Sequence, residues 1–125
     1  MTTVTAADGH EFAVHTAQPS GNTKGLVVVV QEIFGVNEHI RSVADRYAEL
    51  GYMAVAPSLF DRVQKNVELN YDEEGIEVGR KIAFEDLSMD QVMMDIEATI
   101  GHYPQRGGVG IVGYCWGGSI CYVAA

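Results

Sequence analysis

Two kinds of apolar pattern alternate along this chain. Short continuous runs of β-branched and small apolar residues are typical of strands buried on both faces of a sheet. Three such runs occur, at residues 26–30, 53–56 and 109–112. Between the first two, residues 37–50 place their apolar side chains on one helical face, with Asn37 suited to cap the first turn and Gly51 to end the helix. This order predicts a strand, a crossover helix and a parallel strand.

The flanking segments extend the same alternation. Residues 3–16 are typical of a hairpin, because Asp8-Gly9 is a strong tight-turn pair with alternating apolar positions after it. Ser88 and Gln91 form a capping box ahead of an apolar helical stripe. Residues 57–70 are expected to form a loop and residues 71–85 a weak, acidic helix. Alternating strands and helices predict an α/β fold with a mostly parallel sheet.

Composition limits the classes of function. The 125 residues have the size of one domain, and a formal net charge of −9 without a basic stripe argues against a nucleic-acid partner. The longest aliphatic run, residues 26–30, is too short to span a membrane, and the N-terminus lacks the features of a secretory signal. Cys115 and Cys121 match no zinc spacing, so we expect no metal and no cofactor. Two cysteines without a signal peptide are typical of the reducing cytoplasm.

The most specific chemical signal is Gly-Tyr-Cys-Trp-Gly-Gly at residues 113–118. It follows the apolar run 109–112 and precedes a helical segment, which is the arrangement of a nucleophile elbow, G-x-S-x-G, with cysteine in place of serine. An elbow exposes its nucleophile above a helix N-terminus, and the N–H group of the next residue, Trp116, can bind a developing oxyanion. Cys115 is therefore the candidate nucleophile. The alternative is a buried structural cysteine in a glycine-rich turn.

A second candidate region directly follows the run 26–30. In enzymes with such an elbow, the loop after this strand supplies another oxyanion donor, and the N–H group of Ile33 has the right position. Glu32 lies at the carboxyl end of a predicted central strand, where sites form, and an acid there can take the proton of a nearby thiol. The alternative interpretation of Glu32 is an exposed loop acid.

Three motifs follow one another in a fixed order. They are Val-Val-Gln-Glu-Ile-Phe-Gly-Val-Asn at residues 29–37, Leu-Gly-Tyr at 50–52 with Ala-Val-Ala-Pro-Ser-Leu-Phe at 54–60, and Val-Gly-Tyr-Cys-Trp-Gly-Gly at 112–118. Together they resemble the dienelactone hydrolase family (carboxymethylenebutenolidases). The resemblance implies an α/β-hydrolase fold, a mostly parallel sheet with flanking helices, of which residues 1–125 are the N-terminal part, truncated after the nucleophile elbow.

The resemblance also implies hydrolysis of a lactone or ester without a cofactor. It gives Cys115 the role of nucleophile and Glu32 the role of holding and activating the thiol, with the N–H groups of Ile33 and Trp116 as oxyanion donors. The family's catalytic aspartate and histidine follow the elbow and have no counterpart here. All four histidines of this chain precede the elbow, and we interpret them as structural or surface residues.

The implied substrate is a small-molecule ester or lactone, and it can bear a carboxylate because the family binds one with arginines. Arg80 is the better candidate for that contact and Arg62 the second, with an ordinary surface role as the alternative for both. Two other hypotheses stay open. In the first, the chain is a catalytically incomplete fragment that acts with a complementary segment or self-associates through an uncovered sheet edge. In the second, the fold is the same but Cys115 serves thioester or acyl transfer.

Overall fold

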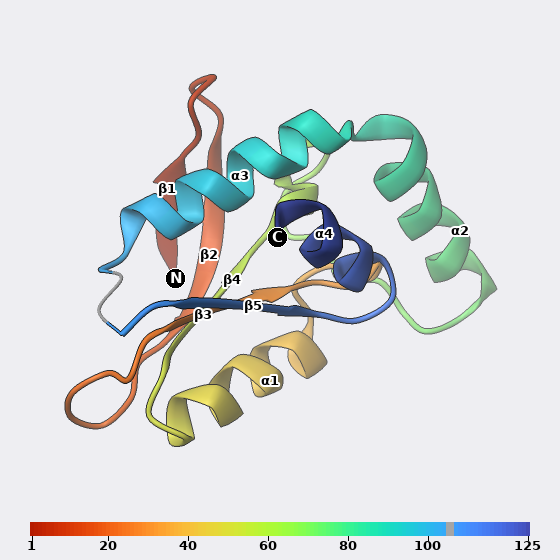
Figure 1. Cartoon of the computed structure of the whole chain (residues 1–125). Coiled ribbons are helices and arrows are strands. Elements are labelled where there is room, and N and C mark those ends of the chain that lie inside the picture. Colours follow the sequence, from red (N-terminus) through yellow and green to blue (C-terminus); the bar gives the residue numbers. More distant parts are fainter. Residues whose placement is uncertain (105–106) are drawn as a thin grey trace.

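The computed structural model describes residues 1–104 and 107–125. Five strands form one sheet in the order β1-β2-β4-β3-β5 (Figure 1). Their bounds are Thr2–Thr5 for β1, Glu11–Ala17 for β2, Leu26–Val30 for β3, Met53–Pro57 for β4 and Val109–Gly113 for β5. The strand β3 pairs in parallel with β4 and β5, whereas β1 and β2 form the predicted antiparallel hairpin and β2 pairs antiparallel to β4. The expected parallel unit and hairpin are both confirmed.

Helices cover both faces of this sheet. They are α1 (Glu38–Glu49), α2 (Glu73–Lys81), α3 (Met89–His102) and α4 (Trp116–Ala124), with the short turns η1 (Leu59–Arg62) and η2 (Ile82–Asp86). Helix α1 lies on one face, and α3 and α4 lie on the other (Figure 1). Because side chains alternate along a strand, Val27 and Val29 of β3 pack in the α1 cluster, while Val28 and Val30 pack in the cluster with α3 and α4. This explains why every residue of β3 is buried.

The predicted helix ends are confirmed by hydrogen bonds. The Asn37 side chain accepts from the N–H group of Ile40 at 3.1 Å, and Gly51 follows α1 with a φ of 101°. At the start of α3, Ser88 and Gln91 exchange both bonds of the capping box at 3.1 Å. These local signals therefore determine where the helices on both faces begin.

Three boundaries differ from the expectation. The predicted loop 57–70 contains the short turn η1, because Leu59 and Phe60 turn inward and are buried in the core. The predicted helix 71–85 is divided into two parts: its first part is α2, and its second part is the π-helical turn η2. In η2 the Leu87 N–H group donates to the Ile82 carbonyl oxygen. Helix α4 begins at Trp116, one residue before the expected start.

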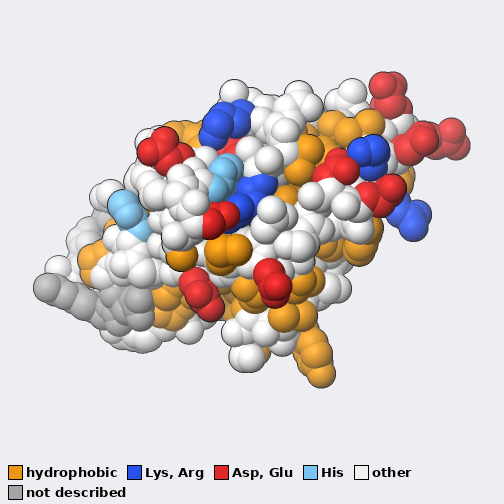
Figure 2. Space-filling model, turned by 90° about the horizontal axis from the view of Figure 1, so that it is seen from above, with side chains coloured by type: hydrophobic (Ala, Val, Ile, Leu, Met, Phe, Trp, Pro, Cys, Tyr) orange, Lys and Arg blue, Asp and Glu red, His pale blue; other side chains and the backbone are white. Residues whose placement is uncertain are grey.

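Strand β5 forms an edge of the described sheet, with β3 as its neighbour there. A hollow of about 460 Å³ runs beside it, lined in part by Tyr47, Tyr52 and Val112. Self-association through this edge stays a prediction. On the face seen from above, acidic and basic side chains are scattered without a continuous basic area (Figure 2). None of the helices in the described residues is long and apolar enough to span a membrane.

Candidate active site

The neighbouring parallel strands β3 and β5 end at the same level of the sheet. Val30 pairs with Gly113 in the last step of their register, so the chain leaves both strands side by side. Glu32 and Ile33 are the second and third residues after Val30. In the same way, Cys115 and Trp116 are the second and third residues after Gly113. The carboxyl ends of such strands are where sites form in α/β sheets. The register thus brings the four expected catalytic residues to neighbouring strand ends.

The turn between β5 and α4 has the geometry of an elbow. Cys115 has a φ of 54° and a ψ of −118°. Residues other than glycine rarely adopt a positive φ. The Gly117 N–H group donates to the Tyr114 carbonyl oxygen at 2.9 Å and closes the turn around it. The thiol at its tip is free and exposed, and α4 begins at the next residue. Cys115 is therefore accessible and not a buried structural cysteine.

The glycines that flank the elbow have no room for a side chain. A Cβ on Gly117 would lie 2.6 Å from each of two carbonyl oxygens at the end of β3, those of Val30 and Gln31. A Cβ on Gly113 would collide with Gly117 itself. The G-x-C-x-G spacing therefore allows the first turn of α4 to pack directly against the end of β3.

The backbone N–H groups of Ile33 and Trp116 are among those at this end of the sheet that have no protein acceptor within the described residues. The Trp116 ring is buried, with its centroid 5.5 Å from that of Phe60, which fixes the start of α4. The carbonyl group of Ile33 packs against α2 at Gly79, where a Cβ would collide with it. Both N–H groups are thus held by rigid neighbours and are free to bind an oxygen atom.

Gln31 fixes the backbone of Glu32. Its side chain is 0% exposed, donates to the Glu32 carbonyl oxygen at 3.0 Å and accepts from the Leu59 N–H group at 2.9 Å. The Oε1 atom of Glu32 is buried and has no hydrogen-bond partner in the described part of the chain. A buried carboxylate oxygen without a partner is unfavourable, and it is typical of a functional group. The anchoring role of Gln31 was not predicted, although a polar residue directly after a fully buried strand is a signal for such a role.

The two candidate arginines have different surroundings. Arg80 is exposed on α2, next to the Gly79 that packs on the Ile33 carbonyl group. The guanidinium of Arg62 is instead bound by two carboxylates, with its shortest contacts 2.7 Å to Asp8 and 2.8 Å to Asp95. The Arg62 side chain is only 7% exposed and is already bound by two carboxylates, which favours a structural role over the predicted substrate contact.

The Asp8–Arg62–Asp95 cluster joins the hairpin turn, η1 and α3. Hydrogen bonding to Arg62 lowers the pKa of Asp8 to about 2. Burial raises the pKa of Asp95, although three hydrogen bonds from Arg62 oppose that shift. The same two carboxylates raise the pKa of Arg62, which stays charged. The arginine therefore offsets part of the cost of burying the Asp95 carboxylate.

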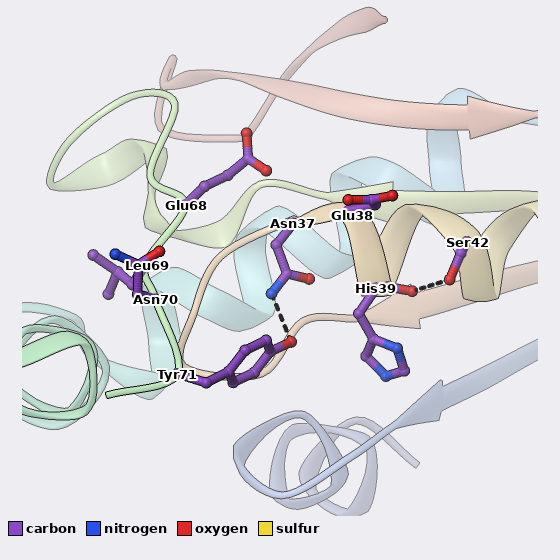
Figure 3. A pocket seen from close by; sticks show the side chains of 8 residues that line it. All are labelled: Asn37, Glu38, His39, Ser42, Glu68, Leu69, Asn70 and Tyr71. Carbon is purple, nitrogen blue, oxygen red and sulfur yellow. Dashed lines mark hydrogen bonds between the residues drawn. The ribbon is translucent and has the colours of Figure 1, made fainter. Parts of the chain in front are cut away.

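The histidines lie apart from one another. In the described residues, His15 contacts Asp45, His10 stacks on Phe12, His102 packs on Tyr103 and His39 lies 6.3 Å from Tyr114 between ring centroids. His39 also lines a hollow of about 540 Å³ at the start of α1, together with Asn37, Ser42 and Tyr71 (Figure 3). Through the contact between His39 and Tyr114, one wall of this hollow comes near the elbow. No group of three metal-binding side chains gathers within residues 1–104 and 107–125.

Comparison with known proteins identifies the family. Residues 12–125 match the model of the dienelactone hydrolase family. The chain belongs to the dienelactone hydrolase family. A Synechocystis protein assigned as a carboxymethylenebutenolidase is 43% identical over 80% of this chain and 42% of its own length, and the carboxymethylenebutenolidase of Pseudomonas putida is 35% identical over 94% and 52%. The chain therefore spans about half the length of these relatives.

Solved structures confirm the fold of this dienelactone hydrolase family member. A Klebsiella pneumoniae protein assigned as a dienelactone hydrolase superposes with a TM-score of 0.80 at 30% identity, covering 99% of this chain and 53% of that one. An α/β serine hydrolase homologue from Coxiella burnetii, 16% identical, shares the fold with a TM-score of 0.63. The predicted α/β-hydrolase architecture with flanking helices is thus confirmed.

Proposed function

We propose that this family member cleaves a carboxylic ester or lactone through Cys115. The observation that best supports the proposal is the positive φ of Cys115 at the exposed tip of a turn whose flanking glycines have no room for side chains. Strain of this kind persists where the surrounding structure enforces it, and it is concentrated at functional sites. A reducing cytoplasm is the proposed compartment, because both cysteines are free thiols.

In the proposed reaction, Glu32 takes the thiol proton and the Cys115 sulfur attacks the carbonyl carbon. A carbon–sulfur bond forms while the carbonyl π electrons move to oxygen, and the resulting oxyanion accepts hydrogen bonds from the N–H groups of Ile33 and Trp116. Collapse breaks the carbon–oxygen bond, and the departing oxygen receives the proton from Glu32. Water then adds to the acyl carbon, the carbon–sulfur bond breaks, the carboxylic acid leaves with the hydroxyl group of water, and the remaining proton of water returns to the Cys115 sulfur. The chain has no aspartate or histidine after Cys115, so the water-activating pair implied by the resemblance is not among these residues.

Acylation by p-nitrophenyl acetate tests this function directly. We expect a stoichiometric burst of p-nitrophenolate and a protein mass increased by an acetyl group, with the modified peptide containing Cys115. Acetylation at Cys121 or at lysines alone would contradict the proposal. Release of free acetate to water supports hydrolysis, whereas transfer to an added thiol would identify the acyl-transfer alternative.

Replacing Glu32 with glutamine is expected to slow the acylation burst by about 100-fold, because general bases contribute on the order of 10²–10⁴ to such steps. The amide keeps the shape of the side chain but cannot take the thiol proton. The measurement is the burst rate at saturating ester. Glu49→Gln, at the exposed far end of α1, is the matched control and should acylate normally. A Glu32→Gln variant as fast as its control would remove Glu32 from the mechanism.

Arg80→Met is expected to weaken binding of a carboxylate-bearing ester by about tenfold, the value of one exposed charge-assisted hydrogen bond. The measurement compares half-saturation by mono-p-nitrophenyl glutarate with half-saturation by neutral p-nitrophenyl acetate. We expect a rise for the glutarate ester and no change for the acetate ester. Arg46→Met, exposed in the last turn of α1, is the control. Equal changes for both esters would show that Arg80 does not bind the carboxylate.

A further inference from the structure

Residues 67–71, which we call the strap, lie against the loop that contains Ile33. The Leu69 N–H group donates to the Phe34 carbonyl oxygen at 3.0 Å. At the centre of the loop, Gly35 has a φ of 89°, and a Cβ there would collide with the backbone of the strap. The strap therefore approaches the loop so closely that only glycine fits between them.

The strap is also joined to the far end of this loop by Arg41. Its Nη1 atom donates to the Val36 carbonyl oxygen at 2.8 Å and to the Glu68 carboxylate of the strap at 3.0 Å. The guanidinium thus bridges the two segments from its position on α1. The backbone bond from Leu69 links the loop to the strap before Gly35, and Arg41 links the two segments after it.

Tyr71 is the strap residue whose side chain contacts the loop at two places, at Phe34 next to its central glycine and at Asn37 where α1 begins. Its ring centroid lies 4.4 Å from that of Phe34, and its hydroxyl oxygen accepts from the Asn37 side chain at 2.9 Å (Figure 3). Tyr71 is nevertheless 63% exposed, so it contributes little buried apolar surface to the core. Its contacts serve the position of the loop more than the stability of the fold.

The peptide between Glu32 and Ile33 has a second support, from Gln31. The Gln31 side chain, buried beneath the sheet end, holds the Glu32 carbonyl group and is itself held by the Leu59 N–H group. The strap contacts described above fall on residues 34–37, which follow Ile33. Because the Glu32 carbonyl group and the Ile33 N–H group belong to one planar peptide, Gln31 holds this peptide on one side, while the strap holds the residues that follow it.

We propose that the strap positions the Ile33 N–H group for oxyanion binding and that Tyr71 is its main positioning residue. The inference rests on the function proposed above. A displaced N–H group weakens an interaction that exists only in the transition state, so acylation slows while binding of the ester is unchanged. A displacement of about 1 Å is enough to cost on the order of 100-fold in rate.

Two reactions of the same thiol test the proposal on the whole chain. Acylation by p-nitrophenyl acetate develops an oxyanion, whereas alkylation by iodoacetamide does not. We expect Tyr71→Phe, which loses the Asn37 bond, to slow acylation by about threefold to tenfold, and Tyr71→Ala to slow it by about 30- to 100-fold. Half-saturation by the ester and the alkylation rate should stay within about twofold of the wild type. Tyr122→Ala, at a tyrosine that is 86% exposed, is the matched control and should change neither reaction.

The outcomes separate this inference from the proposed function. Normal acylation in both Tyr71 variants would overturn the positioning role while leaving Cys115 as the nucleophile. A parallel fall of acylation and alkylation would also overturn it, because it would indicate a general structural role for Tyr71. Absence of a burst in the wild-type chain would overturn the proposed function and, with it, this inference.

Discussion

Replacing Cys115 with alanine is expected to abolish acylation by p-nitrophenyl acetate, a loss of at least about 1,000-fold, because removal of the nucleophile removes the covalent route itself. The proposed oxyanion donors, the N–H groups of Ile33 and Trp116, would remain, yet they would have no tetrahedral intermediate to stabilise. The methyl group of alanine fits wherever the cysteine Cβ fits, so the fold of the elbow should be retained. The measurement is the burst of p-nitrophenolate, with circular dichroism to verify folding.

Cys121 provides a matched control for this variant. It lies in α4, the helix that follows Cys115, and is only partly exposed. Burial raises the pKa of its thiol, so less of it is the reactive thiolate. Cys121→Ala should therefore acylate at the wild-type rate. A burst that survives in Cys115→Ala but disappears in Cys121→Ala would transfer the nucleophile to the other cysteine and refute the elbow assignment.

Local sequence signals predicted the fold well where a residue type strongly favours one structural position, such as a buried strand, a tight turn or a helix cap. The five-residue aliphatic run became the buried strand β3, and Asp8-Gly9 became the turn of the β1–β2 hairpin. Asn37 and Ser88 cap their helices as expected. Each of these signals acts within a few residues, so no knowledge of the tertiary structure is needed to interpret it.

The elbow was predictable for a related reason. The motif at residues 113–118 requires glycines at fixed positions, and the structure shows why, since Gly117 packs on the carbonyl oxygens at the end of β3. The proximity of Glu32 to that elbow needed one further step, the parallel pairing of β3 with β5. The family resemblance implies this proximity through the role it gives Glu32, although it does not predict the strand register.

The contacts that the sequence did not reveal are long-range. Arg62 pairs with Asp8 and Asp95, which are 54 and 33 residues away, and no periodicity relates these positions. The strap contacts of Tyr71 likewise join two irregular segments, where backbone geometry decides which side chains meet. Sequence patterns predict which face of a helix or strand is apolar, but they do not predict which loops contact one another.

Replacing Arg62 with methionine is expected to destabilise the fold by about 3–5 kcal/mol, because it removes one partner of a buried ion pair and leaves the other charge without compensation. The Asp95 side chain is 0% exposed and accepts three hydrogen bonds from the arginine. Without them, Asp95 must stay charged in an apolar site or take up a proton. Urea unfolding monitored by circular dichroism measures the loss, and Arg46→Met, an exposed arginine of α1, should change the stability little.

The double variant Arg62→Met/Asp95→Leu distinguishes charge from packing. Replacing both buried partners with apolar side chains of similar size is often close to neutral, so the double variant should recover most of the stability lost by Arg62→Met alone. Asp8 can remain, because its side chain is 38% exposed and water can solvate its carboxylate. A double variant as unstable as the single one would mean that the arginine stabilises the junction of hairpin, η1 and α3 mainly through packing of its stem. Since domains of this size have total stabilities of about 5–15 kcal/mol, the single variant would lose a large share of the fold's stability through a contact outside the proposed active site.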